Sequence, residues 1–181
     1  TVPFARLVGT NPQLSSFYRR YEIGKVFRDG PVKTGRLREF TQCDVDMVGV
    51  KSILAEAELM AMAVNIFQRL NLEVVISYNH RQLLENILKE TGIKAERYSE
   101  VILSLDKLDK IGKTAVAKEL NQKGFAYPLI ENIFARINQV ALDSREEVTG
   151  SEEQQELQSY LKVLGIEEKT QFNPGLARGL D

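Results

Sequence analysis

The sequence predicts an α+β fold, in which an antiparallel β-hairpin and one further strand are flanked by helices, and a small all-α module follows. Two observations lead to this class. Residues 21–49 contain two strand-like runs on either side of a turn-rich loop, which is typical of a hairpin. Several later segments instead repeat apolar residues every three or four positions, which is the period of an amphipathic helix.

The second strand of the hairpin carries different side chains on its two faces. Side chains alternate across a strand with a period of two. The odd positions suit burial, whereas the even positions from Phe40 to Asp46 carry an aromatic ring, an amide and two carboxylates. We therefore expect Cys43 to be a small buried hydrophobe. In a paired hairpin, Arg28 at the end of the first strand is expected to lie near Gln42 and Asp46.

The polar face of the hairpin has two interpretations. Antiparallel sheets commonly leave one face in solvent, but such a face usually carries Lys, Glu and Thr without order. Ordered aromatic, amide and carboxylate groups opposite an arginine favour a ligand site instead. Guanidinium groups would bind phosphate or carboxylate oxygens, and the carboxylates would hold an amine or a protonated ring. Residues 19–38 carry seven Lys or Arg against two acids, which favours an anionic ligand over a merely solvated basic loop.

Two helices with a strand between them are predicted after the hairpin. Ser52–Leu70 has a wide apolar stripe, and Ser52 is a suitable N-cap. Leu72–Ser77 is a largely apolar run of strand length, as in a covered strand. Asn79–Thr91 has the helical period again, and Gly92 is suited to end the helix.

A small helical module is predicted over residues 93–165. Short amphipathic segments alternate there with polar turns, without the alternation of a strand. Its clearest helices are Pro128–Val140 and Glu152–Leu164. We therefore divide the chain into a core region of residues 1–92, the module, and a return to the core at residues 166–181.

Several stretches resemble the class II aminoacyl-tRNA synthetases in the histidyl version. The most specific is FRDGPVKTGRLREFTQCDVD, which resembles motif 2, a strand, a loop and a strand with an arginine at the end of the first strand. TVPFARL at the start, SLDKLDKIG at residues 104–112 and LARGLD at the end are also similar to family segments. The resemblance implies part of the class II antiparallel sheet with flanking helices. Residues 93–165 would be the insertion domain, which in the family lies over the acceptor end of tRNA.

The resemblance also implies residues that bind ATP. Arg28 would contact the α-phosphate and the amino acid carboxylate, and Arg36 would reach the terminal phosphates. Phe40 would stack on adenine. Arg178 would act at the α-phosphate as the fixed cation that promotes attack. Gly30 stands where many class II enzymes have an acid that reads the adenine amino group.

A second set of residues is implied in binding histidine. Thr1 lies in the segment that holds the amino group in the family, and Gln42 and Asp46 would also hold the substrate. Arg28 and Arg178 would complete this set. The chain would then activate histidine with ATP, accompanied by Mg²⁺, to histidyl-adenylate, and transfer it to tRNA(His).

Two other functional classes stay open at this point. One is a catalytically inactive, synthetase-like regulatory paralogue, such as the regulatory subunit of ATP phosphoribosyltransferase or the tRNA-sensing domain of a translation-factor kinase. The other is an unrelated α+β binding module. Regulatory paralogues of the synthetases tend to lose the arginines that bind phosphate. The presence of Arg28, Arg36 and Arg178 therefore favours the histidine–tRNA ligase. The full-length family forms homodimers.

Composition excludes several further classes. A single cysteine excludes an internal disulfide and a Cys-based zinc site. The single histidine, His80, is a poor metal ligand without partners, so no metal site is predicted. A local polar or capping role is expected for His80. No apolar run reaches the roughly 18 residues of a membrane span, and no signal peptide is visible, so we expect a cytoplasmic protein with no membrane partner. The P-loop and Rossmann glycine motifs are absent. A start without Met and an end inside a family motif suggest a fragment with weak or absent activity alone.

Overall fold

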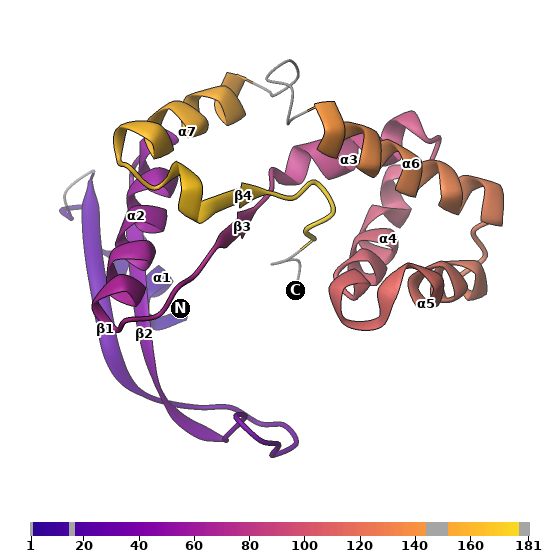
Figure 1. The fold of residues 1–181 in the computed structure, drawn as a ribbon. Helices are drawn as coiled ribbons and strands as arrows, with labels where there is room; N and C mark the ends of the chain where they lie inside the picture. Colours follow the sequence, from indigo (N-terminus) through magenta and orange to yellow (C-terminus); the bar gives the residue numbers. More distant parts are fainter. Residues whose placement is uncertain (1, 15–16, 144–151, 178–181) are drawn as a thin grey trace. The chain divides into compact units, whose positions relative to one another are not determined.

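The computed structural model describes residues 2–14, 17–143 and 152–177 (Figure 1). The chain divides into two compact units, Thr1–Leu59 and Met60–Asp181. Helices and short sheets in both units confirm the predicted α+β class. Within the described ranges, every helix is too short or too polar to span a bilayer.

The first unit is built on the predicted antiparallel hairpin (Figure 1). Strand β1 (Tyr18–Phe27) pairs with strand β2 (Glu39–Val48) along their whole length. The register places Gly24 opposite Gln42, so even-numbered residues of both strands share one face. Pairing continues into the connecting loop, where the Arg28 amide donates to the Arg38 carbonyl at 2.8 Å.

One helix precedes the hairpin and another follows it. Helix α1 (Val2–Thr10) covers residues 2–7 of the TVPFARL segment, for which the sequence predicted no helix. Helix α2 (Leu54–Arg69) confirms the helix expected over residues 52–70. The Leu54 amide donates to Ser52 Oγ at 3.2 Å, as expected of an N-cap.

The burial of the hairpin differs from the prediction around Cys43. Cys43 is exposed, and its neighbours Tyr21, Ile23 and Phe27 on the same face are 75%, 65% and 77% exposed. The even face is half-buried instead, because Phe4 of α1 packs on that side of the strands. The prediction of a buried Cys43 is therefore wrong: polarity alone does not decide which face of a hairpin is covered.

The second unit contains a short parallel sheet. Strand β3 (Ile76–Tyr78) pairs with strand β4 (Thr170–Phe172), which lies far along the chain. The strand predicted at residues 72–77 is thus shorter and later than expected, and Leu72 and Val75 are 52% and 60% exposed. The reason is that the partner strand is only three residues long, so the earlier apolar residues have no neighbouring strand to extend the ladder.

The remaining elements of the second unit are helical. Their positions confirm the helices predicted at residues 79–91, 128–140 and 152–164. Two short 3₁₀ turns, Ala95–Arg97 and Glu167–Lys169, connect them to neighbouring elements. The helices are α3 (Arg81–Glu90), α4 (Tyr98–Leu105), α5 (Leu108–Gln122), α6 (Tyr127–Asp143) and α7 (Glu152–Val163).

One hydrophobic core joins helices α3 to α6. Leu88 of α3, Val101 of α4, Leu120 of α5 and Ile133 of α6 are all fully buried in it. Ala177, near the end of the described chain, belongs to the same cluster. The core includes Leu88 and Ala177, which lie outside the helical module predicted at residues 93–165. The division of the chain into a core region and a module therefore stays a prediction.

Candidate ligand site on the hairpin

The even face of the hairpin forms the floor of a small cavity. Gly24 and Gln42 face each other across the strands, with the Val26–Phe40 pair on one side and the Glu22–Asp44 pair on the other. Phe4 of α1 completes the wall, and the cavity has a volume of about 170 Å³. Gly24 has no side chain, and a Cβ added there would meet no atom within 4 Å. The centre of the cavity is therefore open because of one glycine.

The cavity carries more negative than positive charge. Glu22 and Asp44 line it together with Gln42 and a single guanidinium, that of Arg20. Gln42 Nε2 donates to Asp44 Oδ1 at 2.6 Å, which fixes the amide with its oxygen free to accept a hydrogen bond. Asp46 lies next to this group as the cross-strand partner of Arg20. The arrangement suits a ligand with an ammonium group or a protonated ring.

The structure adds Arg20, which the sequence reasoning missed. Its Nε donates to Asp46 Oδ2 at 2.8 Å and its Nη1 donates to Glu22 Oε2 at 2.6 Å. The guanidinium carbon lies 4.0 Å from the centre of the Phe4 ring. The hydrogen bonds that Arg20 donates to Glu22, and then to Asp46, raise its pKa above the already high ordinary value. No pattern in the sequence singles out Arg20, because its place opposite Asp46 depends on where pairing stops inside the loop.

Arg28 lies at the other end of this face, beside Phe40. Its guanidinium carbon is 4.9 Å from the centre of the Phe40 ring. Since Arg20 pairs with Asp46, and a strand rises about 3.3 Å per residue, the backbone of Arg28 is roughly 26 Å along the hairpin from that of Asp46 and roughly 13 Å from that of Gln42. The Arg28 guanidinium lies over Phe40, which is two positions from Gln42 on the same face. The expectation that Arg28 would lie near Asp46 is therefore wrong, because the register pairs Asp46 with Arg20.

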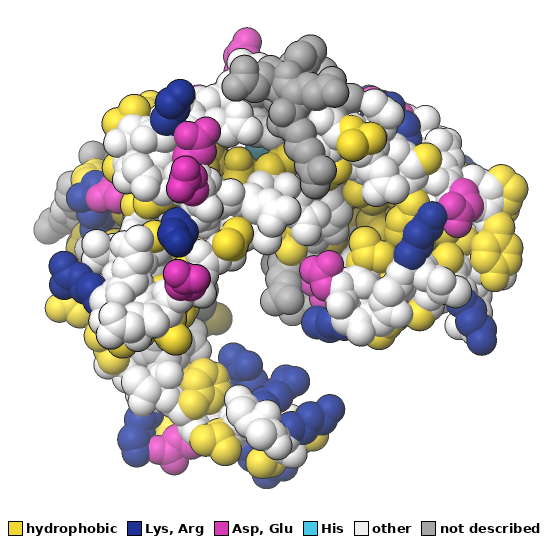
Figure 2. Space-filling view, viewed as in Figure 1, with side chains coloured by type: hydrophobic (Ala, Val, Ile, Leu, Met, Phe, Trp, Pro, Cys, Tyr) yellow, Lys and Arg dark blue, Asp and Glu magenta, His cyan; other side chains and the backbone are white. Residues whose placement is uncertain are grey.

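The loop of the hairpin carries a cluster of basic side chains. Figure 2 shows Lys and Arg side chains gathered at the tip of the hairpin. The loop is folded by a tight turn in which the Lys33 and Arg36 backbones exchange hydrogen bonds of 3.2 and 2.8 Å, with Gly35 at a φ of 73°. Arg38 Nε donates to the Gly30 carbonyl at 3.1 Å, which closes the base of the loop. These cations make the tip suitable for binding phosphate groups.

Two predicted site residues, Thr1 and Arg178, lie outside the described residues. The segment that leads to Arg178 is described as far as Ala177. Asn79 Nδ2 donates to the carbonyls of Pro174 and Leu176 at 3.0 and 2.8 Å, and so fixes that segment against the start of α3.

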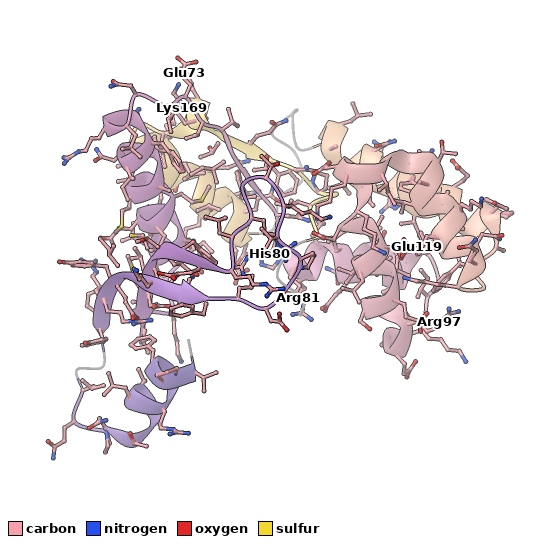
Figure 3. The ribbon with its side chains drawn as sticks, turned by 90° about the horizontal axis from the view of Figure 1, so that it is seen from below. Glu73, His80, Arg81, Arg97, Glu119 and Lys169 are labelled. Atoms are coloured by element: carbon pink, nitrogen blue, oxygen red, sulfur yellow. The ribbon has the colours of Figure 1, made fainter. Side chains whose placement is uncertain are left out.

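A separate polar cluster in the second unit has a structural role. The Glu119 carboxylate accepts hydrogen bonds from Lys107 Nζ at 2.8 Å, Lys123 Nζ at 2.9 Å and Ser104 Oγ at 3.0 Å. Lys107 and then Lys123 hold the pKa of Glu119 at about 2. Figure 3 shows Glu119 among the helices of this unit, and Arg97 in the 3₁₀ turn before α4. The contacts join the end of α4 to both ends of α5, so we assign the cluster to packing.

His80 makes a polar contact with helix α7. Figure 3 shows it beside Arg81 at the start of α3. It occupies the N-cap position without a side-chain cap, and its Nε2 lies 2.6 Å from Glu153 Oε2. The expected polar role is confirmed through a contact with α7, which is distant in sequence, and the side chain makes no cap.

The fold is shared with solved synthetase structures. The crystal structure of histidyl-tRNA synthetase from Nostoc sp. PCC 7120 matches with a TM-score of 0.81 and 26% identity, over 99% of this chain and 45% of that chain. An ATP phosphoribosyltransferase regulatory subunit/histidyl-tRNA synthetase from Bacillus halodurans C matches with a TM-score of 0.75 over 99% of this chain and 49% of that chain. At 17% identity, the second likeness shows the fold alone. The architecture is thus that of the aminoacyl-tRNA synthetases and their structural relatives.

The sequence specifies the family within this class. The family model for histidyl-tRNA synthetase matches residues 1–181. Histidine–tRNA ligase 1 of Bacillus thuringiensis subsp. konkukian (strain 97-27) is 51% identical over 190 residues, which cover 99% of this chain and 45% of the relative. Histidine–tRNA ligase of Bacteroides fragilis (strain YCH46) is 35% identical over 100% of this chain and 43% of the relative. The chain belongs to the histidyl-tRNA synthetase family, and it spans less than half the length of these relatives.

Proposed function

We propose that this chain is the part of a histidine–tRNA ligase that holds histidine and ATP while histidyl-adenylate forms. The hairpin carries the proposal, because one strand face joins an acidic cavity to an aromatic ring and a cluster of arginines. An aminoacyl-adenylate has a cationic amino acid at one end and a phosphate and adenine at the other. The polarity of the face therefore matches the polarity of that product.

The acidic end would bind histidine. Gln42 and Asp46 offer an amide and a carboxylate to the ammonium group and the imidazole N–H of the substrate. A site built to hydrogen-bond a polar substrate rejects apolar analogues strongly, since its own buried polar groups would be left unpaired. The 170 Å³ cavity around Gly24 leaves room for a small side chain. Thr1 is proposed as a further contact to the amino group.

The basic end would bind ATP as its Mg²⁺ complex, in which the phosphates supply ligands to the ion. Phe40 offers its ring to adenine, Arg28 its guanidinium to the α-phosphate, and Arg36 its charge to the terminal phosphates. The histidine carboxylate would attack the α-phosphorus and release pyrophosphate. Arg28 and Arg178 would neutralise the charge that develops on the phosphoryl oxygens, since positioning and fixed charge supply most of the catalysis in such transfers.

The rest of the proposal concerns the whole polypeptide. We propose, on the basis of the family, that the whole polypeptide transfers histidine to tRNA(His), forms a homodimer and is located in the cytoplasm. Residues 1–92 and 166–181 would belong to the class II catalytic core. Residues 93–165 would be the insertion domain that lies over the tRNA acceptor end.

The test is histidine-dependent ATP–pyrophosphate exchange by the natural polypeptide that carries this sequence, with the 181-residue chain measured beside it. Exchange that requires histidine, and that other amino acids do not support, is the expected result. A folded polypeptide without exchange would favour a second candidate, a regulatory paralogue. The fold shared with the Bacillus halodurans C protein is the observation that keeps this candidate in view.

A further inference from the structure

Arg20 is the cation that lines the cavity, and its contacts fix the orientation of its side chain. Arg20 is 17% exposed, and its guanidinium bridges Asp46 and Glu22 through two different nitrogens. One face of the guanidinium is covered by the Phe4 ring at 4.0 Å. The side chain is therefore held in one orientation by two carboxylates and an aromatic plane.

Asp46 depends on this bridge for its orientation. Its Oδ2 accepts from Arg20 Nε at 2.8 Å, so the carboxylate cannot rotate freely about its side-chain bonds without losing a charge-assisted hydrogen bond. Oδ1 would then be the oxygen that accepts a hydrogen bond from a ligand. Arg20 also offsets part of the negative charge of three carboxylates on one strand face, those of Glu22, Asp44 and Asp46.

We propose that Arg20 is a positioning residue for histidine recognition, which holds Asp46 with one oxygen turned toward the ligand. The inference rests on the proposed function, in which Asp46 binds the substrate. Arginine is required for this task because its planar fork reaches two carboxylates at once and packs flat against Phe4. A lysine would supply the charge as a single point and would leave one of the two carboxylates without a partner.

A purely structural ion pair would give a different result from a positioning residue. Loss of a structural pair lowers stability and affects both substrates alike. Loss of a positioning residue raises the KM for histidine and leaves the KM for ATP unchanged, because ATP binds at the Arg28 end of the face. The effect must also depend on Asp46 being present, since Arg20 acts only through it.

The test uses the natural polypeptide with Arg20→Lys and Arg20→Met, each also made in an Asp46→Asn background. We expect Arg20→Lys to raise the KM for histidine about tenfold or more, because histidine binds less tightly. The KM for ATP should stay within about twofold of its value in the unsubstituted polypeptide. In the Asp46→Asn background the same change should have less than about a twofold effect, because the two residues act as a unit. Arg19→Lys is the matched control: Arg19 is the next residue, on the opposite face, where it pairs with Glu58 at 2.7 Å.

Three outcomes would overturn the proposal. The first is an equal rise in both KM values that follows a fall in the melting temperature. The second is an effect of Arg20→Lys that is undiminished in the Asp46→Asn background. The third is an unchanged KM for histidine in both Arg20 variants.

A direct measurement of histidine binding distinguishes failure of the proposed function from failure of the proposed role of Arg20. If the natural polypeptide catalyses no exchange, histidine affinity is measured by isothermal titration calorimetry. If Arg20→Lys lowers the affinity for histidine and Arg19→Lys does not, Arg20 positions Asp46 for histidine binding in a protein that binds histidine without activating it. An absence of histidine binding would overturn both proposals.

Discussion

Replacement of Gly24 by valine separates the ligand-site interpretation of the hairpin from the alternative of a solvated face. Gly24 lies inside a ten-residue strand, and its φ is compatible with any residue. Glycine weakens a strand by about 0.5–1 kcal/mol, and valine favours one, so Gly24→Val should stabilise the protein by about 1 kcal/mol. For a domain of this size the melting temperature would rise by about 2–4 °C.

The same valine should nevertheless impair ligand binding. Its methyl groups would enter the open space opposite Gln42, about 5 Å across the strands, where the histidine side of the cavity lies. We expect the KM for histidine to rise about 100-fold, or about 2.7 kcal/mol, in ATP–pyrophosphate exchange by the natural polypeptide. Lys25→Val is the matched control, because it adds the same side chain at the next position on the opposite, exposed face. A more stable Gly24→Val protein with an unchanged KM would refute the placement of the ligand.

Three further predictions follow from contacts in the structure. Phe40→Ala should raise the KM for ATP about tenfold with little change in the KM for histidine, because base–aromatic stacking contributes about 1–3 kcal/mol; an equal change in both constants would contradict the proposed division of the face. Asn79→Ala should lower the free energy of unfolding by about 1–3 kcal/mol in chemical denaturation, since the carbonyls of Pro174 and Leu176 lose their donor. Asn79→Asp should be at least as destabilising, because a carboxylate cannot donate to these carbonyls. Glu119→Gln should cost about 1–2 kcal/mol at neutral pH, where the native carboxylate, with its pKa lowered to about 2, is fully stabilising. That contribution is complete above the unfolded pKa of 4.5 and is lost as the pH falls toward 2, so melting curves of the two proteins should converge in acid; a gap that persists at pH 2 would count against it.

The elements that the sequence predicted well are those whose signal is local. Helices α3 and α6 bury the apolar positions that their 3.6-residue period selects, including Leu88 and Ile133. The hairpin was also predictable, because two strand-like runs flank a loop rich in turn residues. Strand β3 was predicted poorly because its length is set by a partner strand that lies nearly a hundred residues further along the chain.

The candidate site was predicted in composition but not in geometry. Its residue types followed from the resemblance, yet the position of Arg28 was wrong, because the register depends on where pairing stops inside the loop. The Arg28–Arg38 backbone hydrogen bond sets that point and places Arg20, not Arg28, opposite Asp46. The sequence shows no periodicity from which that single hydrogen bond could be inferred.

The even face of the hairpin keeps carboxylates partly buried. Asp44 and Asp46 are half-buried there, on the side of the strands against which Phe4 of α1 packs. Partial burial of several carboxylates is unfavourable unless they are paired or used. Arg20 pairs with Asp46 and Gln42 donates to Asp44, so what remains unmatched is an excess of acceptor oxygens around an open glycine, which is what a cationic ligand would require.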